Sequence, residues 1–251
     1  MKSITSSLIL SILCIPFIHA GESVEYNVND STYEGYYSAP APGAPLVLLL
    51  HDWDGLTDYE IKRAEMLTKA GYAVIAADLF GKGIRPTENK DKRQHTGELY
   101  QDREKMRRLM EAAMMVASVK GADVENTVVM GYCFGGAAAL EYARSEMTAK
   151  GYVAFHGGLS TPEGQSYENT QGTVLIFHGS ADTLITMKDF ATLTEELESA
   201  KVPHEMITYG GAPHSFTVFE SGAYHEAADK KSWKRFLDFL KEVTPSKENS
   251  N

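Results

Sequence analysis

The stretch Thr127-Val128-Val129-Met130-Gly131-Tyr132-Cys133-Phe134-Gly135-Gly136 decides the fold. Its first half is an apolar run typical of a buried strand, and the alanine-rich residues that follow it, 135–145, have the pattern of a helix. The turn between them is so tight that Cys133 takes strained backbone angles, while Gly131 and Gly135 let strand and helix approach without side-chain clashes. The pattern therefore predicts a strand–turn–helix unit that exposes the Cys133 side chain at the edge of a sheet.

A cysteine in this turn is well placed to act as a nucleophile. The helix N-terminus beneath Cys133 favours negative charge and thereby a thiolate. The backbone N–H of Phe134 would face a developing oxyanion. The alternative is a structural cysteine beside a turn, because free cysteines are common in protein interiors. The strand–turn–helix context, with an acid and a histidine farther along the chain, favours the nucleophile.

Strand patterns alternate with helix patterns along the rest of the chain. Further strands are expected at Leu46–Leu50, Tyr72–Ala77, Tyr152–Phe155, Thr173–Phe177 and His204–Tyr209, and helices at Asp58–Ala70, Gln101–Lys120, Gly135–Ser145, Thr186–Ala200 and Glu226–Val243. Val24–Val28 and Thr32–Ser38 predict an antiparallel hairpin, and the polar segment Ile84–Thr96 is expected to be an exposed loop. This alternation indicates an α/β fold with a mostly parallel central sheet and helices on both faces.

Two polar residues lie in loops at the carboxyl ends of strands, which is where the active sites of such folds are found. Asp182 follows the strand expected at Thr173–Phe177, and His214 follows the strand expected at His204–Tyr209. A thiol nucleophile needs a base, and the base needs an orienting group. In this arrangement the acid precedes the histidine in the chain. We therefore expect His214 to be the base and Asp182 the group that orients it beside Cys133.

Other titratable residues compete for these roles. Structural roles are expected for the remaining histidines of the strand ends, loops and helix starts, which are His95, His156, His178, His204 and His225. Asp78 also ends a strand but precedes the nucleophile, so we expect it to be a cap or a loop hydrogen-bonder. A metal site at His51, Asp52 and Asp54 lacks a second histidine at ligand spacing, so no metal is expected there.

Further site residues are expected near the loop after the first central strand. The second oxyanion donor should come from such a loop, and the backbone N–H of Trp53 is the candidate. Candidate substrate-pocket residues, together with the Trp53 ring, are Asp52, Tyr132, Phe80 and Phe216. Packing in the core is an equally good interpretation for Tyr132 and Phe216, since aromatic side chains dominate protein cores.

The composition describes an acidic globular protein. The chain has 251 residues, of which 43% are hydrophobic, and that suits one compact domain with a sizeable core. Its formal net charge is −10, with both signs interspersed along the chain. Because phosphate backbones repel such a surface, binding to nucleic acid is not expected.

The first twenty residues have the order of a signal peptide. A weakly basic start precedes the mostly apolar run 4–18 and then Ala20, where we expect cleavage. The run is short for a membrane span, so we expect export to the periplasm or the medium, a single domain over residues 21–251 and no stable membrane insertion afterwards. The alternatives are a buried strand or an uncleaved anchor. Cleavage would remove Cys14 and leave Cys133 as a lone, reactive thiol.

Together these motifs resemble those of the dienelactone hydrolase family in the α/β-hydrolase superfamily. The resemblance rests on Gly131-Tyr132-Cys133-Phe134-Gly135-Gly136, on Asp182 in His-Gly-x-x-Asp, on His214 in Gly211–Phe216, and on Gly71-Tyr72 through Asp78-Leu79-Phe80. It covers the chain from about Leu46 to the last helix. The resemblance implies an α/β-hydrolase fold, a triad of Cys133, His214 and Asp182, no cofactor, and hydrolysis of an enol-lactone or a related ester.

Two positions depart from the pattern that the resemblance implies. The lactone-cleaving members carry a glutamate where this chain has Asp52, and an arginine four residues after the histidine, where it has Val218. The arginine would hold a substrate carboxylate. We therefore expect a small-molecule ester or lactone, cleaved by a carboxylesterase-like reaction through a thioester, without naming the substrate. The rival hypotheses are a non-catalytic binding protein on a hydrolase scaffold, a thiol redox protein that uses Cys133, and a peptidase.

Overall fold

One sheet forms the centre of the molecule, whose computed structural model describes residues 21–145 and 147–245. In chain order the strands are β1 (Glu22–Val28), β2 (Ser31–Ser38), β3 (Pro45–Leu50), β4 (Ala73–Ala77), β5 (Asp123–Tyr132), β6 (Gly151–Phe155), β7 (Thr173–Gly179) and β8 (His204–Tyr209). Their spatial order is β1-β2-β4-β3-β5-β6-β7-β8. The β1–β2 hairpin is antiparallel and so is its pairing with β4, whereas β3 to β8 are parallel.

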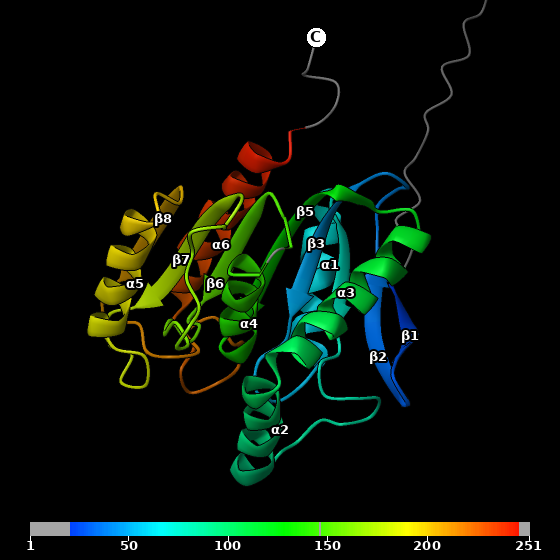
Figure 1. Cartoon of the computed structure of the whole chain (residues 1–251), viewed down its shortest axis with the longest axis horizontal. Coiled ribbons are helices and arrows are strands. Elements are labelled where there is room, and N and C mark those ends of the chain that lie inside the picture. The colour runs from blue at the N-terminus through cyan, green and yellow to red at the C-terminus, as the bar shows by residue number, and fades with distance from the viewer. Residues whose placement is uncertain (1–20, 146, 246–251) are drawn as a thin grey trace, which may run out of the picture.

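Helices cover both faces of this sheet (Figure 1). They are α1 (Asp58–Lys69), α2 (Asn89–Gln101), α3 (Arg103–Val119), α4 (Phe134–Ala143), α5 (Met187–Ser199) and α6 (Glu226–Val243). Core residues of α3, α4 and α5 gather on one face, and those of α1 and α6 gather on the other. Within the described ranges, no helix combines the length and the apolar character that crossing a membrane requires.

The strand β3 shows why the apolar runs are continuous. Its side chains alternate between the two faces, as in every strand. Leu46, Leu48 and Leu50 belong to the core under α3 and α4, whereas Val47 and Leu49 belong to the core under α1 and α6. A parallel strand covered on both faces needs apolar residues at every position. The predicted α/β class, with its mostly parallel sheet and two helical layers, is therefore confirmed.

One expected element is wrong. The exposed loop predicted at Ile84–Thr96 contains most of α2, which runs from Asn89 to Gln101 and is separated from α3 by Asp102 alone. Only Thr96 and Leu99 of this helix are buried, so its polar sequence lacks the apolar stripe by which surface helices are usually detected. The predicted signal peptide, residues 1–20, lies outside the described residues.

Candidate active site

The turn at Cys133 has the strained geometry that its glycines predict. Cys133 links β5 to α4 with φ 50° and ψ −110°, in a region that non-glycine residues rarely occupy. A Cβ on Gly131 would lie 2.2 Å from the carbonyl of Gly135, and one on Gly135 would lie 2.2 Å from the carbonyl oxygen of Leu50. Only glycine fits these contacts. The turn therefore brings the first residues of α4 against the end of β3, and it leaves the thiol partly exposed.

Three predicted side chains meet at this turn. The Sγ of Cys133 lies 3.2 Å from Nε2 of His214, and Nδ1 of the same ring lies 2.7 Å from Oδ2 of Asp182. The other oxygen, Oδ1, accepts hydrogen bonds from the backbone N–H groups of Leu184 and Ile185 at 2.8 and 2.9 Å. These two bonds hold the carboxylate in one orientation. The structure thus brings a thiol, an imidazole and a carboxylate into one hydrogen-bonded chain.

The hydrogen bonds among these three side chains shift the pKa values of His214 and Asp182. Burial opposes protonation of His214, but its hydrogen bonds with Asp182 and Cys133, and the charges of both partners, raise the pKa of the imidazole to about 10. Burial would raise the pKa of Asp182, yet the hydrogen bonds from His214 and from the N–H of Ile185 lower it below its ordinary value. The arrangement therefore favours a protonated His214 imidazolium beside the Asp182 carboxylate, with its Nε2 turned toward the Cys133 sulfur.

The two predicted oxyanion donors are backbone N–H groups at the start of α4 and in the loop after β3. Phe134 is the first residue of α4, so its backbone N–H has no acceptor within the helix. Trp53 lies in the turn after β3, where Asp54 donates its N–H to Oδ1 of Asp52 at 2.8 Å. Among the described residues, no hydrogen bond engages the N–H of Trp53. Because the first turn of α4 packs on the end of β3, the start of α4 and the loop after β3 meet beside Cys133.

The candidate pocket residues divide into two groups. Asp52 is 8% exposed, and burial raises its pKa to about 6, against a smaller opposing effect of the hydrogen bond from the N–H of Asp54. Phe80 also lies beside the site, with its ring centroid 5.7 Å from that of Phe134. By contrast, Tyr132 and Phe216 are fully buried in the core between the sheet, α1 and α6. For these two the core-packing interpretation agrees with the structure, because β5 and the loop after β8 turn both rings inward.

Sequence reasoning missed the residues that α2 brings to the site. The ring of Tyr100 is 38% exposed and meets that of Phe134 edge-on at 5.3 Å. Burial and the nearby charge of Cys133 raise the pKa of its phenol. His95 stacks on Phe80 with centroids 5.3 Å apart. The signal that could have indicated this helix is the i, i+3, i+4, i+7, i+8 spacing of Lys92, His95, Thr96, Leu99 and Tyr100.

The remaining candidates have structural roles. Asp78 accepts three backbone hydrogen bonds, as predicted, from the N–H groups of Glu34, Phe80 and Gly81. Both ring nitrogens of His51 are hydrogen-bonded to backbone groups, so this ring has no free donor for a metal. In the described part of the chain, no three metal-ligating side chains form a group. The other histidines pack or cap locally, and His225 caps α6 by accepting from the N–H of Ala228.

The loop that carries His214 is anchored through a buried threonine. The hydroxyl of Thr217 lies 2.7 Å from the phenol oxygen of Tyr59 and 2.8 Å from Nε2 of His156. Its carbonyl accepts a hydrogen bond from Arg63 at 2.8 Å, and Arg63 is paired with Asp229 of α6. The His156 ring in turn meets the His214 ring edge-on at 5.4 Å. This Thr217 anchor ties the histidine loop to α1 and α6.

Sheet order, the turn at Cys133 and the loop positions of Asp182 and His214 define the class of α/β hydrolases. The chain belongs to the dienelactone hydrolase family, whose model matches residues 33–244. This membership makes it a carboxylic ester hydrolase.

Individual relatives agree with that placement. A carboxymethylenebutenolidase of Pseudomonas putida is 25% identical over 221 residues, which cover 83% of this chain and 91% of the relative. An uncharacterized protein of Caenorhabditis elegans is 32% identical over 149 residues, or 55% of this chain and 94% of the relative. The crystal structure of a dienelactone hydrolase-like promiscuous phosphotriesterase from metagenomic libraries superposes with a TM-score of 0.83 at 28% identity, covering 89% and 98% of the two chains.

Proposed function

We propose that Cys133, His214 and Asp182 form a catalytic triad that hydrolyses carboxylic esters or lactones through a thioester acyl-enzyme. The observation that carries this proposal is the hydrogen-bonded chain of the three side chains, with links of 3.2 and 2.7 Å, at a strained turn. A nucleophile, its base and the group that orients the base are the parts that acyl transfer needs.

The reaction then proceeds in two halves. The Cys133 thiolate attacks the acyl carbonyl carbon, and the N–H groups of Phe134 and Trp53 stabilise the oxyanion. The tetrahedral intermediate collapses as the C–O bond breaks, and the imidazolium of His214 gives its proton to the leaving alkoxide, so an alcohol departs and a thioester remains. His214 next removes a proton from water, whose oxygen attacks the thioester. The acid product leaves, and the thiolate–imidazolium pair returns.

The surroundings of the thiol favour an uncharged substrate. Tyr100 and Phe80 present aromatic rings on the side of α2. The position four residues after His214 holds the apolar Val218. The cation of Lys92 lies over the Trp53 ring but is paired with Asp54 at 2.6 Å. An aryl or alkyl ester, or a lactone without a carboxylate, therefore suits this site better than dienelactone itself.

The decisive experiment compares p-nitrophenyl acetate turnover by the wild-type protein and by Cys133→Ala. We expect the variant to lose about 10⁴-fold or more in kcat, as when a triad member is removed. Equal rates in the two proteins would refute the assignment. A wild-type protein that turns over no ester or lactone in a panel, yet binds members of it, would support the binding-protein hypothesis. Fast oxidation of Cys133 by peroxide without ester turnover would support the redox hypothesis.

A second candidate activity is phosphotriester hydrolysis. It is favoured by the likeness to the promiscuous phosphotriesterase, at 28% identity and a TM-score of 0.83. The same thiolate can attack phosphorus, and the same backbone donors can stabilise the negative charge that develops on oxygen. Release of p-nitrophenol from paraoxon tests this activity. Loss of that release in Cys133→Ala would place both reactions at one site, whereas no release by the wild-type protein would exclude it.

We also propose export, with cleavage after Ala20. The first described strand, β1, begins at Glu22, so this cleavage leaves the sheet whole. Mass spectrometry of the protein recovered from outside the cytoplasm should give a chain that begins at Gly21. An intact N-terminus in a cytoplasmic protein would contradict the proposal.

A further inference from the structure

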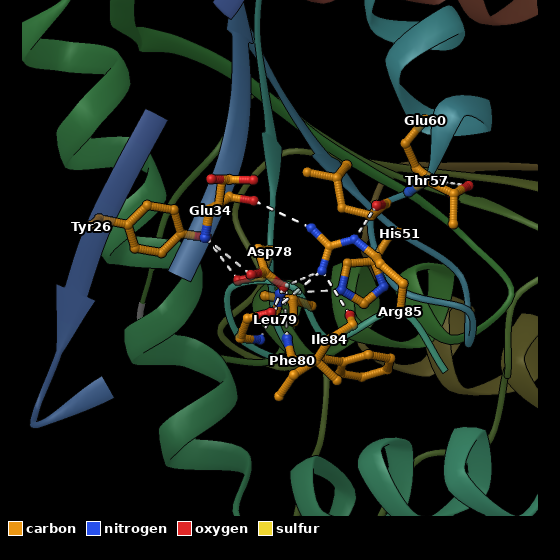
Figure 2. A network of polar contacts seen from close by, with 12 residues as sticks. Tyr26, Glu34, His51, Thr57, Glu60, Asp78, Leu79, Phe80, Ile84 and Arg85 are labelled. Atoms are coloured by element: carbon orange, nitrogen blue, oxygen red, sulfur yellow. Dashed lines mark hydrogen bonds and ion pairs between the residues drawn. The ribbon is translucent and has the colours of Figure 1, made fainter. Parts of the chain in front are cut away.

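A buried polar cluster joins the loops after β3 and β4 (Figure 2). We call His51, Asp78 and Arg85 the β3–β4 brace. His51 directly follows β3 and Asp78 directly follows β4, and the side chains of both are excluded from solvent. Arg85 reaches in from the segment before α2 and is 27% exposed. None of the three touches the Cys133–His214–Asp182 chain, and the proposed reaction does not use them.

His51 holds the residue that precedes Trp53. Its Nδ1 lies 2.6 Å from the carbonyl oxygen of Asp52, and its Nε2 lies 3.1 Å from the backbone nitrogen of Leu79. Since the carbonyl must accept and the N–H must donate, the ring proton sits on Nδ1. Burial lowers the pKa of His51 to about 4, so the ring is neutral at neutral pH. His51 therefore couples the loop after β3 to the loop after β4.

Arg85 holds the far end of the same loop. Its Nε donates to the carbonyl of Leu56, and its Nη1 donates to the carbonyl of Ile84 at 2.7 Å. Figure 2 shows the guanidinium beside Ile84 and the carboxylate of Asp78, whose Oδ1 lies 3.5 Å from Nη1. Asp78 is fixed in turn by backbone donors, including the N–H of Glu34 at 3.0 Å. The guanidinium thus spans three segments of chain.

Between the hydrogen bonds of His51 and those of Arg85, the loop has little conformational freedom at Trp53. Asp54 donates to the Asp52 side chain at 2.8 Å, and Glu60 accepts from the N–H of Thr57 at 2.8 Å. Gly55 has φ 85°, and a Cβ there would lie 2.9 Å from the carbonyl oxygen of Ile84. The loop can therefore lie against the Arg85 segment only with a glycine at this point. The direction of the Trp53 N–H is set by bonds to the residues on either side of it.

We propose that Arg85 and His51 are positioning residues that aim the backbone N–H of Trp53 at the oxyanion. This inference rests on the proposed ester hydrolysis and adds to it a device outside the triad. The Trp53 N–H shares a rigid peptide plane with the Asp52 carbonyl, so it cannot rotate without the adjoining backbone. Its direction is therefore set by fixing the Asp52 carbonyl before it and the Leu56 carbonyl after it. Pre-aimed donors stabilise developing charge without reorganisation during the reaction.

Two reactions of Cys133 distinguish the contribution of the β3–β4 brace from that of the triad. Alkylation by iodoacetamide needs the thiolate and forms no oxyanion, whereas acylation by p-nitrophenyl acetate needs both. In Arg85→Met, which keeps the length but removes the donors, we expect kcat/KM for the ester to fall about 100-fold. The alkylation rate should stay within about twofold of wild type, because the Cys133–His214 contact is untouched.

Two further variants control this test. Arg93→Met makes the same substitution on the exposed surface of α2 and should change neither rate. His51→Asn keeps a donor for the Asp52 carbonyl but loses the acceptor for Leu79, so its effect should be smaller and of the same kind. Thermal melting confirms that each variant is folded at the assay temperature.

The outcomes are distinguishable. Ester turnover that survives in Cys133→Ala refutes the proposed function itself. With that function intact, an Arg85→Met protein that keeps full ester activity overturns the positioning role. A folded Arg85→Met protein that loses alkylation and acylation in equal measure also overturns it, because the brace would then hold the whole site and not the oxyanion loop.

Discussion

Two loops flank the Cys133 thiol, and they are held in different ways. The loop after β3, residues 51–57, offers a backbone N–H and is tied by bonds to its own carbonyls from His51 and Arg85. The loop after β8 offers the side chain of His214, whose ring is oriented by Asp182 and whose backbone is tied down at Thr217. A backbone donor is aimed only by constraining the chain, whereas a side chain is aimed by a partner.

This difference separates the expected effects of substitution. Changes at the histidine loop should alter the ionisation of the thiol and therefore every reaction of Cys133. Changes at the loop after β3 should alter only reactions that build charge on oxygen. Alkylation and ester hydrolysis, measured side by side, test this separation.

Among substitutions in the surroundings of the thiol, the largest effect is expected from His214→Ala. Without its hydrogen-bond partner, which lies 3.2 Å away, Cys133 loses the base and the stabilising cation. Ester kcat/KM should fall roughly 10⁴-fold, and iodoacetamide labelling at neutral pH should slow as well. His204→Ala, at the start of β8, is the control and should label and turn over like wild type. Unchanged labelling of the His214 variant would show that another base serves the thiol.

Asp182→Asn should come next and should carry a pH signature. The hydrogen bond with Asp182 is the largest cause that raises the pKa of His214, to about 10. For an alkyl ester, whose leaving alkoxide needs a proton, the acylation rate of the wild type should therefore fall as pH rises through about 10, where the His214 imidazolium is lost. In the variant this fall should move to lower pH, with turnover reduced by about 10²-fold or more. A pH–rate profile that does not move would exclude Asp182 as the orienting group.

Thr217→Val should reduce both reactions about tenfold, since a loop displaced by a fraction of an ångström weakens the contact with the thiol. The variant leaves Tyr59 and His156 without their shared partner in the interior. Its free energy of unfolding in urea should drop by about 1–3 kcal/mol. Thr192→Val, on the exposed side of α5, should change none of the three measurements. Loss of ester turnover alone would show that the two loops are not held separately.

The smallest effect is expected at Tyr100. Its ring meets that of Phe134 edge-on, so Tyr100→Phe, which keeps the ring, should leave kcat/KM for aryl esters nearly unchanged. Tyr100→Ala should raise KM by about two- to tenfold, the worth of one aromatic contact. Equal effects of the two variants would assign the role to the hydroxyl.

The sequence predicted those features that depend on neighbours along the chain. Gly131 and Gly135 indicate the tight turn at Cys133, and apolar runs such as Leu46–Leu50 indicate strands covered on both faces. Because parallel strands end at one edge of the sheet, the positions of Asp182 and His214 after two such strands predict that both lie near that turn. The helix α2 escaped prediction because only two of its residues are buried.

Local pattern therefore determined the class of fold and the three residues that meet at the thiol. Tertiary structure alone decided what surrounds them: that Tyr132 and Phe216 turn into the core, that α2 brings Tyr100 against Phe134, and that Arg85 reaches across to Leu56. Burial and hydrogen bonding between residues distant in the chain depend on how strands are ordered and helices are laid over them. Periodicity in a single sequence records which face of an element is buried but not which partner covers it.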